Sequence, residues 1–191
     1  MGTRGLCGFR KNGMDKLTYN HYDSYPSYLG EIMVEFCKTT SIKEMNDIFD
    51  RIVLVEEGST PTQTQIDECI EFYNGGVSTG KVEDWYCLLR EAQGNPNVYK
   101  RGLKYMIDNQ GFIHDSLFCE YAYIINLDTN CLEFWVGFQT KPCNANRYGI
   151  EGRESYGGSS YYPCKMVAYY SLDTEQTIEE IVDDMNKMSE E

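Results

Sequence analysis

An Asn-Gly pair near the start of the chain constrains its fold more than any other feature. Asn12 and Gly13 lie between two short strand-like runs within the first twenty of 191 residues. Both central residues of a type I′ turn need positive φ angles, which asparagine and glycine adopt most easily. The sequence therefore predicts a β-hairpin over residues 3–20, and a polar segment that ends near Gly30 follows it.

The next ninety residues are predicted to be mainly helical. Ser41 with Glu44 three residues later forms a capping-box pattern, and Thr60-Pro61 places a proline at the first position of another helix. The β-branched residues in 52–55 favour a short strand, and the alternative is that these residues extend the helix from Ser41. Apolar spacing and caps predict helices over 28–37, from Ser41, from Thr60-Pro61, over 82–93 and, capped by Asn97, over 98–107, with the strand over 52–55.

The second half of the chain changes to strand patterns. Residues 118–127 and 132–138 read as two antiparallel strands around a tight turn, and residues 165–171 as a final strand. Residues 174–188 form an amphipathic helix pattern. We expect a single α+β domain over residues 1–191. Its sheet is mostly antiparallel and combines the N-terminal hairpin with the C-terminal strands, and the helices inserted between them pack on it.

The charge is strongly acidic and uneven, with a net value of −13. Residues 172–191 hold eight acidic residues against one lysine, Lys187. We expect repulsion from free nucleic acid and anionic lipid, and attraction to a basic protein surface. The alternative is that the charge serves solubility alone. The chain shows neither a run of roughly 18 apolar residues nor a signal-peptide pattern, so we expect a cytoplasmic location and no membrane partner.

The eight cysteines include no C-x-x-C pair, which argues against a zinc knuckle or a redox motif. Most lie in apolar runs, so we expect reduced, buried thiols. Cys143 and Cys164 lie in or beside a polar stretch and are predicted to be the most exposed. Gly75 to Lys81 has phosphate-loop spacing, but Val82 stands where a magnesium-binding hydroxyl is needed, so we expect a plain loop. We predict no metal site and no cofactor.

The polar segment after the hairpin offers the main candidate for chemistry. It contains His21, Asp23 and Ser24, and His114-Asp115-Ser116 is a similar triplet. The members of a catalytic triad converge from separate parts of a fold, which three residues within four positions do not do easily. We favour a turn in which the Asp23 and Ser24 side chains bond the backbone. A site that joins His21 to Asp115 is the alternative.

A long polar stretch over residues 140–162 is rich in Asn, Gly, Ser and Tyr. Tyrosines among small residues and arginines are typical of adaptable recognition surfaces. The alternative is a long loop that packs its tyrosines on the sheet. On the first interpretation, Tyr156, Tyr161 and Tyr162 are candidates for binding a partner.

Two motifs carry a resemblance. The start M-G-T-R-G-x-x-G-F and the segment Y-N-H-x-D-S-Y-P-x-x-L-G resemble a widespread group of proteins of phages, mobile elements and some microbial genomes. The match covers about a sixth of the chain. Its acidity and size, taken with this start, are also similar to those of type II-A anti-CRISPR proteins, which inhibit Cas9. The motif residues singled out in this chain are Arg4, Asn20, His21, Asp23, Ser24, Tyr25 and Pro26.

The second resemblance implies a non-catalytic inhibitor, encoded by a phage or mobile element, that binds guide-loaded Cas9 in a host bacterial cell. An acidic surface would replace phosphates in a cationic channel. Our candidates for that surface are Glu179, Glu180, Asp183 and Asp184. One alternative is a hydrolase, for which an N-terminal-nucleophile type would expose Gly2 or, after further loss, Thr3. Another is a phage accessory or structural protein. We assign no catalytic residue.

Overall fold

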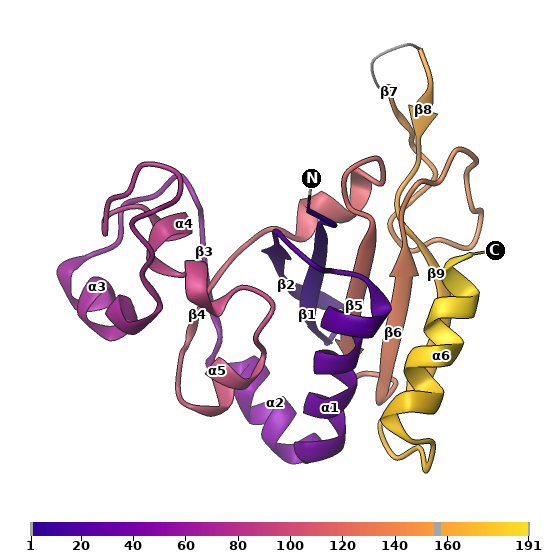
Figure 1. Ribbon diagram of the computed structural model, residues 1–191, viewed down its shortest axis with the longest axis horizontal. Helices are drawn as coiled ribbons and strands as arrows, with labels where there is room; N and C mark the ends of the chain where they lie inside the picture. Colours follow the sequence, from indigo (N-terminus) through magenta and orange to yellow (C-terminus); the bar gives the residue numbers. More distant parts are fainter. Residues whose placement is uncertain (1, 155–157, 191) are drawn as a thin grey trace.

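A computed structural model describes residues 2–154 and 158–190, and the fold is α+β as predicted (Figure 1). The elements in chain order are β1 (Gly5–Lys11), β2 (Met14–Asn20), the π-helix η1 (Pro26–Gly30), α1 (Glu31–Thr39), α2 (Ile42–Arg51), β3 (Val53–Val55), α3 (Gln63–Cys69), the 3₁₀ helix η2 (Ile70–Phe72), α4 (Trp85–Leu88), the 3₁₀ helix η3 (Arg90–Ala92), α5 (Asn97–Lys100), β4 (Tyr105–Ile107), the 3₁₀ helix η4 (Gln110–His114), β5 (Tyr121–Asn126), β6 (Cys131–Val136), β7 (Arg153–Glu154), β8 (Ser160–Tyr161), β9 (Lys165–Ser171) and α6 (Ile178–Ser189).

The main sheet joins the two ends of the chain in the strand order β2-β1-β5-β6-β9. The predicted hairpin is confirmed: Asn12 and Gly13 have φ angles of 53° and 71° in the turn between β1 and β2. Strand β1 also pairs with β5, and this pairing is parallel, with Gly5 opposite Tyr121. The other pairings in this sheet are antiparallel. The hairpin therefore completes a sheet whose other strands lie a hundred residues later.

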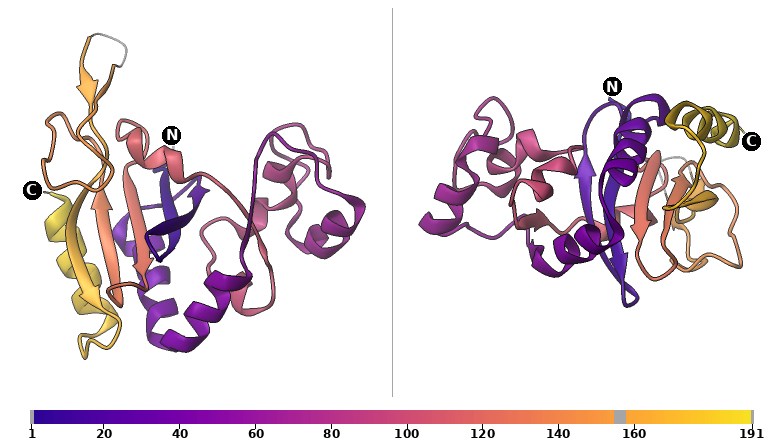
Figure 2. Two further views of the ribbon diagram at one scale, coloured as in Figure 1. Left: turned by 180° about the vertical axis from the view of Figure 1, so that it is seen from behind. Right: turned by 90° about the horizontal axis from the view of Figure 1, so that it is seen from below.

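Strand β5 in the middle of the sheet is buried on both faces, which explains its nearly continuous apolar run. On one face Tyr123 and Ile125 pack with the helices, and α1 and α6 lie together on this side (Figure 2). On the other face Ala122 and Ile124 pack in a smaller cluster with Trp135. Alternate residues of β5 thus serve two cores, as the two-residue period of a strand requires.

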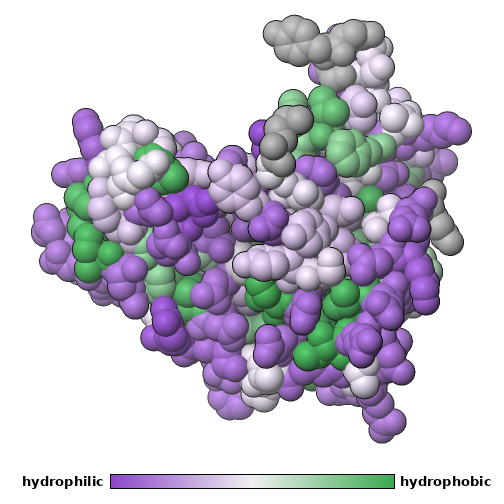
Figure 3. Space-filling model, in the orientation of Figure 1, coloured by the Kyte–Doolittle hydropathy of each residue, from purple (hydrophilic) through white to green (hydrophobic). Residues whose placement is uncertain are grey.

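Helices and short strands from the middle of the chain form a lobe beside the sheet. The lobe contains α3, α4 and the parallel pair β3–β4, and it lies at the opposite end of the molecule from α6 (Figure 1). The space-filling view shows a notch between this lobe and the sheet (Figure 3). Because β3 and β4 are parallel, the residues that follow each strand emerge at the same edge.

Several predicted helix boundaries are wrong. The helix predicted from Thr60-Pro61 begins later, because Thr62 is its cap and forms a reciprocal capping box with Gln65. The helix predicted over 82–93 is divided into the short α4 and η3. The helix predicted over 98–107 ends at Lys100, and residues 105–107 form β4 instead. Tertiary pairing with β3 overrides the helical spacing of these apolar residues.

The cysteines are free, as expected, and all eight lie in the described part of the chain. Six are buried, whereas Cys131 and Cys143 are half-buried. The prediction of an exposed Cys164 is wrong, because its side chain is fully buried in the smaller core and its thiol donates to the Cys119 carbonyl oxygen. Burial raises the pKa of Cys7 and Cys37 to about 12, so these thiols stay protonated and inert.

Candidate functional site

The polar segment after the hairpin is a turn anchored by Asn20. The Asn20 side-chain amide donates to Ser24 Oγ at 2.9 Å and to the Tyr22 carbonyl oxygen. Ser24 is fully buried, and its backbone N–H donates to the Thr3 carbonyl oxygen. The side-chain hydrogen bonds that hold this turn therefore come mainly from Asn20, and the prediction that Asp23 and Ser24 supply them is wrong. A buried serine held in this way has no access to a substrate.

The rest of the motif shapes the backbone. Asp23 has a φ of 54°, a conformation that aspartate tolerates better than most residues, and its side chain is exposed. Tyr25 is the cap of η1, and Pro26 is its buried first residue. A Cβ on Gly30 would lie 3.1 Å from the Tyr123 ring. These contacts give the motif a structural role in bringing α1 onto the sheet.

His21 is the motif residue with an unusual electrostatic setting. Tyr19 Oη lies 2.7 Å from His21 Nδ1. Burial lowers the pKa of His21, and the charges of Arg90 and Arg4 lower it further. Arg90 lies 5.5 Å from the centroid of the Tyr22 ring, and Arg4 lies 5.4 Å from that of Phe118. Within the described residues neither arginine forms an ion pair with a carboxylate. The site is thus cationic around a neutral imidazole.

This setting predicts the titration of both histidines. We expect His21 to titrate below its ordinary pKa, and Arg90→Gln to move its pKa upward without restoring it, because burial is the larger cause. His114 serves as the internal control. Burial and the charge of Arg153 lower its pKa, and Arg90→Gln changes neither cause, so the pKa of His114 should stay the same. Imidazole NMR shifts followed against pH measure both values. An unchanged pKa of His21 in Arg90→Gln would contradict the placement of Arg90 near His21.

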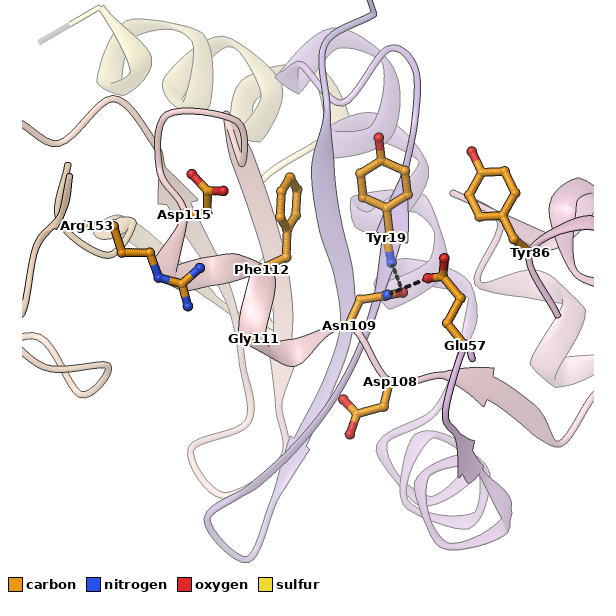
Figure 4. A pocket seen from close by; sticks show the side chains of 9 residues that line it. All are labelled: Tyr19, Glu57, Tyr86, Asp108, Asn109, Gly111, Phe112, Asp115 and Arg153. Atoms are coloured by element: carbon orange, nitrogen blue, oxygen red, sulfur yellow. Dashed lines mark hydrogen bonds between the residues drawn. The ribbon is translucent and has the colours of Figure 1, made fainter. Parts of the chain in front are cut away.

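A pocket of about 520 Å³ adjoins the group formed by His21, Tyr19, Arg4 and Arg90 (Figure 4). Tyr19 belongs to this group and also lines the pocket. Its hydroxyl hydrogen-bonds His21, and its ring packs edge-on against Phe112 with centroids 5.3 Å apart. Glu57 and Asp108 reach the pocket from the ends of β3 and β4, which the parallel pairing brings to one edge. The pocket is lined by Tyr19, Glu57, Tyr86, Asp108, Asn109, Gly111, Phe112, Asp115 and Arg153.

The pocket wall carries three carboxylates against one guanidinium. None of Glu57, Asp108 and Asp115 forms an ion pair within the described residues. Glu57 accepts from the Asn109 side chain at 3.3 Å, and Asp108 accepts from Gln110. Arg153 is the one cation of the lining, at the far end from Glu57 and Tyr86 in Figure 4.

Asp115 and His21 do not form a joint site. Asp115 lines the pocket, but His21 does not, and the His114 ring packs against Tyr148 with centroids 5.8 Å apart. Ser116, the last member of the second triplet, is fully buried and its hydroxyl accepts from the Gln139 N–H. Neither triplet therefore has the arrangement of a nucleophile, a base and an acid.

A second polar cluster fixes part of the 140–162 stretch to the sheet. Arg147 makes two hydrogen bonds to the buried Glu133, at 2.8 and 2.6 Å, and its guanidinium lies over the Trp135 ring at 4.6 Å. The Tyr148 hydroxyl donates to the buried Asp15 at 2.8 Å. Tyr148 therefore packs on the sheet, whereas Tyr161 and Tyr162 are half-buried. Tyr156 lies outside the described residues.

The four acidic candidates on α6 fall into two pairs. Glu180 accepts from the Thr177 N–H in a capping box, and Asp184 accepts from the Tyr170 hydroxyl at 2.6 Å. Glu179 and Asp183 are exposed, lie one turn apart and make no side-chain hydrogen bond or ion pair to any described residue. The outer side of α6 therefore presents two carboxylates to solvent, while Ile181, Val182 and Met185 are buried.

The main residues of the pocket could not be identified from the sequence. Glu57, Tyr86 and Arg153 come from three separate loops or short elements, and none belongs to a recognisable motif. In the described part of the chain, no three His, Cys, Asp or Glu side chains are placed to hold a metal ion. Within the same residues, no helix combines the length and apolarity needed to traverse a bilayer.

Comparisons with protein-family models, curated proteins and solved structures found no significant match to this chain.

Proposed function

We propose that this chain is a non-catalytic binding protein that presents the outer side of α6 to a cationic, nucleic-acid-binding groove of another protein. The observation that supports this most is the exposed pair Glu179 and Asp183, two carboxylates one turn apart on a helix anchored by its apolar face. Spaced carboxylates can occupy positions that phosphates take in such a groove. The chain's net charge of −13 supports long-range attraction to such a partner.

Guide-loaded Cas9 is the partner that the resemblance of the N-terminal motifs, acidity and size suggests. Its channels for duplex and heteroduplex are positively charged. On this proposal the protein is a stoichiometric inhibitor encoded by a phage or mobile element. A hydrolase is supported less well, because the serine hydroxyl of the motif, that of Ser24, is buried and accepts from Asn20.

A cleavage assay with charge reversal tests the proposal. We expect the protein to inhibit guide-loaded Cas9 at near-equimolar ratio, and Glu179→Lys with Asp183→Lys to raise the inhibitory concentration about tenfold or more by replacing attraction with repulsion. The choice avoids Glu180 and Asp184, which stabilise the structure. Glu31→Lys with Glu35→Lys is the control, since both glutamates are exposed, lie one turn apart on α1 and give the same change in net charge.

Each result has a separate meaning. Absence of inhibition by the unmodified protein would remove Cas9 as the partner. Equal weakening in the α6 variant and the control would assign the effect to net charge and contradict a role for the outer side of α6. Loss of inhibition in the α6 variant alone, with weaker binding at higher salt, supports the proposal.

A further inference from the structure

The Glu57 end of the pocket brings two tyrosine rings and a carboxylate together. Tyr19 comes from β2, Tyr86 from α4 and Glu57 from the loop after β3. In Figure 4 the Glu57 carboxylate lies between and below the two rings. We call Tyr19, Tyr86 and Glu57 the tyrosine–glutamate cage. It combines aromatic faces with a negative charge, which is the combination that attracts an organic cation.

The cage is held in place by contacts outside it. The Tyr19 backbone N–H donates to Asn109 Oδ1 at 3.0 Å, and Asn109 Nδ2 in turn donates to Glu57. One asparagine thus links the strand that carries one ring to the carboxylate. The Tyr86 N–H donates to Asp84 Oδ1 at 2.9 Å, which fixes the start of α4. Side chains held before binding lose little conformational entropy when a ligand arrives.

The surrounding charges favour a cation at this end. Asp108 adds negative charge to the wall, whereas Asp115 and Arg153 lie together at the far end of the pocket (Figure 4). Arg4 and Arg90 are the other cations near Tyr19, but they lie over Phe118 and Tyr22, which do not line the pocket. The Tyr19 hydroxyl also points away from the cage, toward His21.

We propose that the tyrosine–glutamate cage binds a guanidinium group, supplied by an arginine side chain of the protein partner. A guanidinium is planar, stacks on aromatic rings, is weakly hydrated and bonds a carboxylate with two parallel N–H groups. An ammonium is a compact, strongly hydrated charge that uses neither the stacking nor the paired geometry. Only the source of the guanidinium rests on the proposed function; the affinity of the cage for the group does not.

A small probe tests the cage without any partner. N-acetyl-L-argininamide carries one guanidinium and no other charge, and N-acetyl-L-citrullinamide is its uncharged counterpart of the same shape. We expect the arginine probe to bind with a Kd of about 1 mM, a value typical of a ligand of this size. Its addition should shift the Asn109 side-chain amide signals in an NMR titration, and the citrulline probe should leave them in place. N-acetyl-L-lysinamide should bind at least about fivefold more weakly.

Variants of the cage complete the test. Glu57→Gln keeps an acceptor for Asn109 and removes the charge, so we expect at least about a fivefold loss of affinity for the arginine probe. Tyr86→Leu removes one ring and should weaken binding about threefold or more. Glu56→Gln is the matched control, because Glu56 is the neighbouring exposed residue and does not line the pocket; it should change nothing.

The outcomes decide the proposal. Binding of the arginine probe that Glu57→Gln weakens and Glu56→Gln does not supports the cage. Equal shifts with the citrulline probe, tighter binding of the lysine probe, or an unchanged Kd in Glu57→Gln would each overturn it. Because this titration contains no partner, a cage that fails here leaves the α6 assay standing, and a failed cleavage assay leaves the cage standing.

Discussion

Replacing Arg147 with alanine is expected to lower the free energy of unfolding by about 3 kcal/mol. The guanidinium makes two hydrogen bonds to the Glu133 carboxylate, whose side chain is only 6% exposed. Removal of the arginine leaves a buried charge with the Asn126 amide and the Trp135 N–H as its remaining donors. The loss comes mainly from that uncompensated charge, and partly from lost packing over the Trp135 ring.

The pH dependence of the variant identifies Glu133 as the cause. Burial opposes ionisation of Glu133, but the hydrogen bonds from Arg147 and Asn126 outweigh it and hold its pKa below the usual range. Its contribution to stability is therefore present above the unfolded pKa and lost as pH falls through the folded pKa. Without Arg147, the effect of burial prevails and the pKa of Glu133 in the folded state rises. Protonation of Glu133 at low pH then removes the uncompensated charge and reduces the destabilisation of the variant. The difference in unfolding free energy should narrow toward low pH.

Urea unfolding of Arg147→Ala at several pH values measures this effect. Arg153→Ala is the control, since Arg153 lies in the same long stretch, is exposed and forms no ion pair within the described residues. It should change stability by about 0.5 kcal/mol or less. If Arg147→Ala lowers the free energy of unfolding as little as the control, or by the same amount at neutral and acidic pH, the assigned role of the Arg147–Glu133 pair is contradicted.

Replacing Gly8 with alanine should cost about 3 kcal/mol of unfolding free energy or prevent folding. Gly8 lies in the middle of β1, opposite Leu17 on one side and Ile124 on the other. Its φ is +155°, and a Cβ built there would stand 2.1 Å from the Lys16 carbonyl oxygen. The obstacle is backbone of the paired strand, so relief requires the hairpin itself to move.

Gly58→Ala is the matched control for this substitution. Gly58 lies in the loop after β3, and no atom lies within 4 Å of a Cβ placed on it. The same chemical change should therefore leave stability within about 0.5 kcal/mol. Thermal unfolding followed by circular dichroism compares the two variants. A Gly8→Ala protein as stable as Gly58→Ala would show that the β1–β2 register differs from the one described.

The elements predicted well from the sequence are those specified locally. The β1–β2 turn needs positive φ at Asn12 and Gly13, and their chemistry alone indicates it. The final helix, predicted over 174–188 from its regular apolar stripe, forms over Ile178–Ser189, and the capping box at Thr177 and Glu180 sets its later start. Strand β9 matches its predicted range, residues 165–171. In these segments local preference and tertiary structure agree.

The segments predicted wrongly are those in which distant pairing decides. Residues 105–107 have helical spacing, but parallel pairing with β3 makes them a strand. Cys164 follows directly on the polar 140–162 stretch and Pro163 in sequence, but its thiol enters the smaller core beside Cys119. The main-chain pairing of β1 with β5 is parallel, a direction that hydrophobic patterns do not encode. None of these three outcomes follows from a window of neighbouring residues.

The candidate site was predicted only in part for the same reason. His21 and Arg4 belong to motifs visible in the sequence, and the structure brings both near Tyr19. Arg90, Glu57 and Tyr86 join them from segments with no pattern of their own. A residue's type also does not fix its role. Ser24 has the hydroxyl of a candidate nucleophile, but in the structure it is buried and holds a turn in place.

The position of β1 between β2 and β5 determines when the protein can fold during synthesis. β1 leaves the ribosome more than a hundred residues before β5, so one of its edges remains without a partner until residues 121–126 have emerged. A nascent chain of about half length would carry an incomplete sheet with unpaired backbone groups, and such edges promote association between chains. Chaperones of the cell would therefore meet this chain before β1 is paired on both edges.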